Sequence, residues 1–190
     1  GSGALDITAT GAVTSAYASG IFADGQGTDL TISAAAVSGG DEGIQARNLG
    51  TGALSITASD DVTGTGGDGI YAYGKGTSLT ISAASVSGKD FGIAAKNKGS
   101  GPLSITVSGD VSATAANGYG IVSSSDLGDA VAINVLSTAS VNATFAIIDT
   151  NGDAVVTISD GAEVTGLITL QDGNDTLTIG SGVTLSDVTG

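Results

Sequence analysis

The sequence predicts an all-β fold, a right-handed parallel β-helix of about eight coils, with three short strands in each coil of about 24 residues. Three observations lead to this prediction: an internal repeat, apolar residues spaced two apart at matching points of the repeat, and turn-forming residues between them. Coils of this kind bury apolar side chains only by stacking on one another. Residues 1–190 are therefore expected to form a single domain.

The repeat can be seen by eye. GALDIT at residues 3–8 returns as GALSIT at 52–57 and as GPLSIT at 101–106, in steps of 49 residues. The half-copies TDLTIS at 28–33 and TSLTIS at 77–82 reduce the unit to about 24 residues. Looser copies follow from Val131, so residues 1–122 are expected to form regular coils and residues 123–190 less regular ones.

Each unit begins with an apolar pair two residues apart, the spacing of side chains on one face of a β-strand. A valine follows seven to ten residues later, and then a Gly-Ile step. The pairs are Leu5/Ile7, Leu30/Ile32, Leu54/Ile56, Leu79/Ile81, Leu103/Ile105, Val131/Ile133, Val156/Ile158 and Leu177/Ile179. These three apolar points predict three strands per coil, and stacking would align equivalent residues in ladders about 4.8 Å apart.

The turn residues complete the pattern, since 32 glycines and many Ser, Thr and Asp separate the apolar points. Helical repeats are disfavoured because glycine and β-branched residues fill every segment. A propeller blade would need four strands in about 40 residues, which fits the repeat less well. Right-handedness is expected from the general preference of parallel crossovers.

Composition narrows the function. The chain has no His, Cys, Met or Trp, which removes the usual general base, the thiol nucleophile and the soft metal ligands. We expect no enzyme, no cofactor and no metal site. A formal charge of −14 argues against binding nucleic acid or an anionic membrane surface. The sequence has no run of about 18 apolar residues, so it does not predict insertion of this chain into a membrane.

The GxLxIT…V…GI coils, rich in Gly, Ser, Thr and Asp, resemble the passenger region of bacterial autotransporter (type V secreted) proteins along essentially the whole chain. Filamentous haemagglutinin-like adhesins and phage tailspikes have similar coils. The resemblance implies a fragment of a longer passenger that is secreted or displayed at the bacterial surface, anchored through an outer-membrane barrel absent from this chain. It implies an adhesin or a rigid spacer, whose partners would be a host cell-surface or matrix protein, a glycan, or further copies of itself.

Two motifs allow other chemistry. The segment Gln171–Thr178 is similar to the calcium-binding nonapeptide of secreted toxins, but it lacks the leading Gly-Gly and occurs once, so an ordinary Asp/Gly turn is expected. Paired carboxylates could cleave a glycosidic bond, as in tailspike-like or lyase-like β-helices, which is the alternative function. Most aspartates here stand beside glycine or in turns, which favours a structural role. A cluster of carboxylates in a groove on one face would favour the enzyme.

The basic residues supply the candidate site. All five lie between Arg47 and Lys98, and in the strand after the Gly-Ile step alternation places most of them outward beside tyrosines. Stacking would put Tyr73 between Arg47 and Lys96 on adjacent coils, within range for a cation–π contact. The candidate partner-binding residues are Arg47, Tyr71, Tyr73, Lys75, Lys96 and Lys98. The other interpretation is a structural ladder in which these cations relieve acidic repulsion.

The spacing also predicts an extruded loop. Between Leu103 and Val131 there are 28 residues, more than one regular coil needs. The surplus is expected within Ala113–Gly120 or Ser123–Gly128, and loops on solenoids often carry function.

Overall fold

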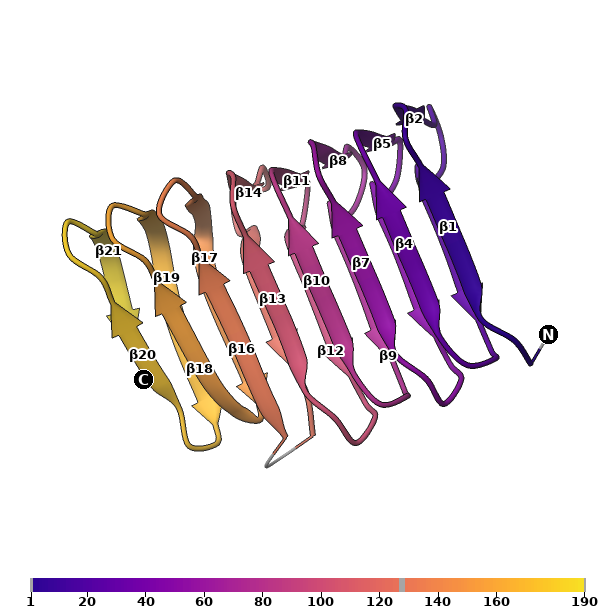
Figure 1. The fold of residues 1–190 in the computed structure, drawn as a ribbon. Coiled ribbons are helices and arrows are strands. Elements are labelled where there is room, and N and C mark those ends of the chain that lie inside the picture. Colours follow the sequence, from indigo (N-terminus) through magenta and orange to yellow (C-terminus); the bar gives the residue numbers. More distant parts are fainter. Residues whose placement is uncertain (1, 127–128, 190) are drawn as a thin grey trace.

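A computed structural model describes residues 2–126 and 129–189, and it confirms the all-β solenoid: these residues form strands and turns without a helix. The strands stack as parallel ladders into a rod, with the N-terminus at one end and the C-terminus near the other (Figure 1). The chain ascends the near sheet, crosses at the top and descends behind as it advances, which makes the coil right-handed (Figure 1). It makes about seven turns, slightly fewer than the eight coils predicted, because eight stacked strands are separated by seven turns.

The first strand of every coil belongs to one eight-stranded parallel sheet. Its inward Leu/Ile pairs are fully buried from β4 to β13, because each aliphatic side chain lies between aliphatic neighbours one coil away on either side. In sheet order the strands are β1 (Leu5–Ala9), β4 (Leu30–Ala34), β7 (Leu54–Ala58), β10 (Leu79–Ala83), β13 (Leu103–Val107), β16 (Ala130–Val135), β18 (Asp153–Ile158) and β20 (Thr176–Ile179).

The second and third strands of each coil form the other two faces. The second strands are short: β2 (Val13–Thr14), β5 (Val37–Gly39), β8 (Val62–Gly64), β11 (Val86–Gly88) and β14 (Val111–Ala113). The third strands are β3 (Ile21–Gly25), β6 (Ile44–Asn48), β9 (Ile70–Gly74), β12 (Phe91–Asn97) and β15 (Tyr119–Ser124). Further on, single long strands run across both faces: β17 (Ser140–Asn151), β19 (Glu163–Asp172) and β21 (Thr184–Thr189).

The register confirms the predicted columns with one exception. Valines pair along the second face and isoleucines of the Gly-Ile steps along the third, as the spacing predicts. Val131/Ile133 was expected to align with Val156/Ile158, and that alignment is wrong: Ile133 pairs with Val156, and Val135 with Ile158. The shift is two residues, so every side chain keeps its face, which is why sequence periodicity could not detect it.

The extruded loop lies in the first of the two predicted segments. Five residues, Thr114–Gly118, connect β14 to β15, whereas two connect β11 to β12. In the second segment, Ser125 occupies the strand position of Asn97 and lies the same distance in sequence from the next coil. Leu127 and Gly128 are outside the described residues.

Buried asparagines close the turn after the third strand in alternate coils. Asn48 is fully buried, and its Nδ2 donates to the carbonyl oxygens of Thr28, Gly52 and Ala53 at 2.9, 3.2 and 3.0 Å. Asn97, 49 residues later, repeats the arrangement with Gly101. Between them the equivalent position is Gly74, where a Cβ would lie 3.1 Å from Oδ1 of Asn97. This alternation explains why the longer repeat is two coils rather than one.

Candidate partner-binding face

The six predicted partner-binding residues lie together on the third face, on β6, β9, β12 and the turns that follow. Asp24, Arg47, Tyr73, Lys96 and Ser124 form one outward column in strict register, as predicted. Tyr71 belongs to the parallel outward column, between Gln45 and Ala94. Lys75 and Lys98 begin the next turns, where their backbone amides bond the preceding coil. The sequence therefore located this cluster correctly in space.

Two of its cations already have anionic partners. Arg47 forms an ion pair of 3.5 Å with Asp24 on the preceding coil, and Nζ of Lys98 lies 2.6 Å from Oδ1 of Asp126 on the following coil. Tyr73 lies between Arg47 and Lys96, but the described residues form no cation–π contact there. The pairs support the structural-ladder interpretation for Arg47 and Lys98. Lys75 and Lys96 are exposed and have no ion pair within the described part of the chain.

An aromatic stack on the same face was not predicted. Phe91, Tyr119 and Phe145 occupy one column on successive coils, with ring centroids 5.0 and 4.7 Å apart and ring planes within 16° of parallel. The three residues precede inward isoleucines at unequal sequence intervals of 28 and 26 residues. Because the first interval contains the extra loop, a search at the 24-residue period does not align them.

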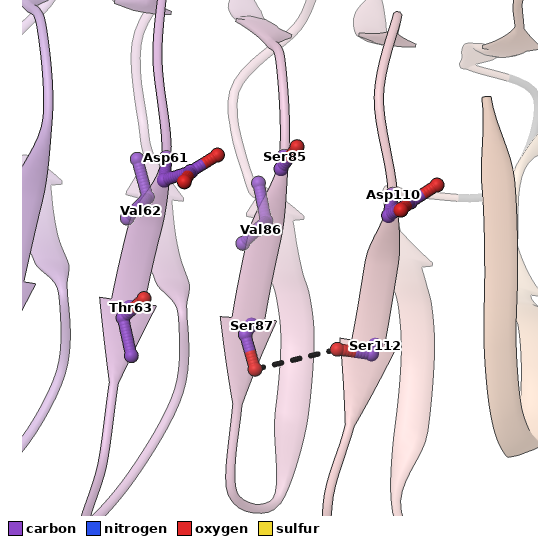
Figure 2. A pocket seen from close by; sticks show the side chains of 8 residues that line it. All are labelled: Asp61, Val62, Thr63, Ser85, Val86, Ser87, Asp110 and Ser112. Carbon is purple, nitrogen blue, oxygen red and sulfur yellow. Dashed lines mark hydrogen bonds between the residues drawn. The ribbon is translucent and has the colours of Figure 1, made fainter. Parts of the chain in front are cut away.

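A shallow trough runs along the second face, beside the short strands. One hollow of about 290 Å³ is lined by β8, β11 and β14 and shares Asp61 and Thr63 with a second of about 140 Å³ toward β2. Asp61 and Asp110 flank Ser85 on adjacent coils, and their carboxylates point to the same side (Figure 2). Ser112 donates to Ser87 at 3.3 Å across the floor (Figure 2). Outside the hollow, Ser140 donates to Oδ1 of Asp110 at 2.7 Å.

One carboxyl group lies inside the rod. Asp149 occupies the inward position that alanine holds in the first coils and Ser123 in the preceding one, and it is fully buried. Its Oδ1 accepts from Oγ of Ser123 at 2.5 Å, while Oδ2 has no hydrogen-bond partner among the described residues. The pKa of Asp149 is raised to about 7, chiefly by burial; the Ser123 hydrogen bond lowers it and the charge of Asp175 raises it. Strand alternation could have predicted that Asp149 points inward. The irregular spacing of its coil, however, prevents alignment of this residue with the earlier coils.

The predicted Asp/Gly turn joins the last coil to the one before. Asp175 accepts from the backbone N–H of Ala154 at 2.9 Å, and Asp153 accepts from that of Asn174 at 3.0 Å. Gly173 has a φ of +147°, and a Cβ there would collide with the carbonyl oxygen of Gly152. Among residues 2–126 and 129–189, no three acidic side chains come together in a way that could hold a metal ion.

The fold and this face define the chain as a β-solenoid with an aromatic and mixed-charge surface along one side. No protein-family model, curated protein or solved structure matches the chain. The described residues contain no helix long and apolar enough to cross a membrane.

Proposed function

We propose that this chain is a non-enzymatic segment of a bacterial surface or secreted protein, a rigid rod that acts as an adhesin or as a spacer presenting a binding face. The observation that carries the proposal is the concentration of exposed Lys75 and Lys96 with Tyr71 and Tyr73 on adjacent coils of an otherwise acidic chain. Tyrosine and arginine are the residues that dominate binding energy at protein interfaces. The resemblance to autotransporter passengers supports the same location and role.

The rod suits that role physically. Seven ladder steps of about 4.8 Å give a length of about 34 Å. Each step is held by a backbone ladder, over an aliphatic column that is buried from β4 to β18. Its partners would be a host cell-surface or extracellular-matrix protein, a glycan, or another copy of the chain.

The experiment is a binding screen of the folded chain on arrays of matrix proteins and glycans, run beside a variant with Arg47, Lys75, Lys96 and Lys98 all replaced by serine. The proposal predicts at least one specific signal, which the variant loses. A control variant with Thr31, Thr80 and Thr157 replaced by serine alters the first face instead and should keep the signal. Absence of any signal with the intact chain, or a signal equal in the charge variant, would contradict a binding role for this face.

The Asp61–Asp110 trough is the observation that favours the alternative, a carbohydrate-active β-helix. Two carboxylates flank one hollow, as an inverting glycosidase requires, but two coil spacings separate them by about 9.6 Å, near the upper limit of the useful range. Both are exposed, and Asp110 is engaged by Ser140. Cleavage of a polysaccharide by the intact chain, abolished in Asp61→Asn and in Asp110→Asn, would establish this function instead.

A further inference from the structure

The aromatic stack of the third face ends abruptly at Phe91. Tyr119 covers one face of the Phe91 ring, at 5.0 Å. On the other side, the preceding coil has Asp68 at the matching position, immediately before the Gly69-Ile70 step as Phe91 precedes Gly92-Ile93, and Gly69 bonds the Phe91 carbonyl at 2.9 Å. Because a carboxylate is smaller than a ring, the column is interrupted where a fourth ring would stand.

A hollow of about 230 Å³ lies at that interruption. Tyr71 forms one side, Ala94 and Val122 are the small residues of its floor, and Lys96 lies at its far end along the strand. Pockets for drug-sized ligands are generally about 300–1,000 Å³, so this space suits one planar group of a larger partner. The hollow is open to solvent, and Phe91 contributes to its apolar lining together with Tyr71, Ala94, Ala95 and Val122.

The charge around the hollow indicates which planar group fits. The pKa of Asp68 is raised to about 6, chiefly by burial and then by the neighbouring charges of Glu42, Asp90 and Asp41, against a hydrogen bond from the Phe91 backbone that lowers it. Oxygens of Asp41 and Glu42 both lie over Gly67, at 3.2 and 3.5 Å from where its Cβ would be. In the described part of the chain, no ion pair neutralises these four carboxylates.

Four kinds of occupant differ in how well they fit this hollow and its charge. A neutral sugar could stack on Phe91 but would leave the carboxylates uncompensated, and an acidic glycan would be repelled by them. An ammonium group supplies charge but is strongly hydrated and has no flat face. A guanidinium stacks on an aromatic face while its in-plane N–H groups bond carboxylates. Lys96 at one end of the hollow and Lys89 next to Asp90 in sequence would repel a positively charged ligand near them. The guanidinium is therefore directed to Asp68.

We propose that the hollow between Asp68 and Phe91 binds an arginine side chain of a partner protein, with the guanidinium stacked on the free face of Phe91 and its N–H groups directed at Asp68. This proposal assumes one part of the proposed function, namely that a protein partner binds the third face. The hollow shares Tyr71 and Lys96 with the basic edge, defined as Arg47, Lys75, Lys96 and Lys98 with Tyr71 and Tyr73. The contact proposed here differs in using Asp68 and Phe91, since the partner supplies the positive charge.

The test uses short acetylated and amidated peptides in which glycines flank one arginine, one citrulline or one lysine, titrated against the folded chain and followed by the NMR signals of the Phe91 and Tyr71 rings. Citrulline has nearly the shape of arginine without its charge. We expect the arginine peptide to bind roughly tenfold more tightly than the citrulline peptide, with the lysine peptide between them. Raising the salt concentration should weaken binding.

Two variants locate the contact. Asp68→Asn should weaken arginine binding roughly tenfold, whereas Asp61→Asn on the second face should leave it unchanged. Ala94→Leu fills the floor from an outward position without altering charge, and it should also abolish binding. Equal affinity for arginine and citrulline, unchanged binding in Asp68→Asn, or stronger perturbation of the same signals by a neutral trisaccharide would overturn the inference. The peptide titrations test Asp68, whereas the array screen tests the loss of Arg47, Lys75, Lys96 and Lys98. Either proposal can therefore fail without the other.

Discussion

The Cβ atom that Gly69 lacks would lie 2.4 Å from Cγ1 of Val86 in the following coil, closer than Cβ atoms approach other atoms in proteins. The same relationship holds for Gly20 with Val37 and for Gly120 with Val141, both at 2.6 Å. The glycine of each Gly-Ile step is therefore required by the valine that packs on it from the next coil, and the two parts of the sequence pattern have one physical cause.

Gly69→Ala should consequently destabilise the fold. The added methyl meets a buried valine and the carbonyl oxygen of Gly92, so a cost of about 1–3 kcal/mol is expected from overpacking. Gly11→Ala is the matched control, because nothing lies within 4 Å of the added atom. Urea unfolding of both variants measures the difference, and equal stabilities would contradict the packing.

The inward isoleucine column gives a stronger test of the architecture. Ile81 is fully buried between Ile56 and Ile105, so Ile81→Asp would put an unpaired charge among aliphatic side chains. We expect a loss of more than about 4 kcal/mol in the free energy of unfolding. Thr80→Asp, one residue away and outward, should cost about 0.5 kcal/mol or less. Melting of Ile81→Asp within a few degrees of the unmodified chain would show that the column is not internal.

These relationships were accessible from sequence because stacked coils repeat them. Leucine aligns with leucine and valine with valine at a nearly fixed interval, so the repeat period predicts which residues stack in each column. The register of Val156 could not be obtained in this way, since a shift of two residues preserves every apolar and polar position. The Phe91–Tyr119–Phe145 stack was missed for the opposite reason: the extra residues of Thr114–Gly118 break the period without breaking the ladder.

The buried Asp149 predicts an unusual dependence of stability on pH. Its folded pKa of about 7 lies above the ordinary value of 3.8, so between these limits the folded chain retains a proton that the unfolded chain releases. The contribution of this group to stability is therefore full below about pH 4 and falls as pH rises, by up to about 1.4 kcal/mol per pH unit, until about pH 7.

Asp149→Ala isolates that contribution, because alanine holds the same inward position in the earlier coils. The variant should gain stability over the unmodified chain on going from about pH 4 to about pH 8. Denaturant unfolding at the two pH values measures the gain. A constant difference between the two proteins would mean that Asp149 is ionised within the fold.

Calcium should have little effect on this chain. Asp153 and Asp175 each use Oδ1 to bond a backbone amide of a neighbouring coil, and no three acidic side chains of the described residues come together to hold a metal ion. Millimolar calcium is expected to shift the Tm by about 1 °C or less. An increase of several degrees, reversed by a chelator, would reveal a site completed by other oxygens.

If the third face binds a partner through the basic edge of Arg47, Lys75, Lys96 and Lys98, the association should depend on salt concentration. For a component identified on the arrays, the Kd of the intact chain should rise several-fold between about 50 mM and about 500 mM NaCl, because exposed charges are screened. Replacing Arg47, Lys75, Lys96 and Lys98 with serine should weaken binding at low salt and flatten that dependence, while the Tm changes little. An unchanged Kd and an unchanged salt dependence in this folded variant would contradict the claim and leave these residues with a structural role alone.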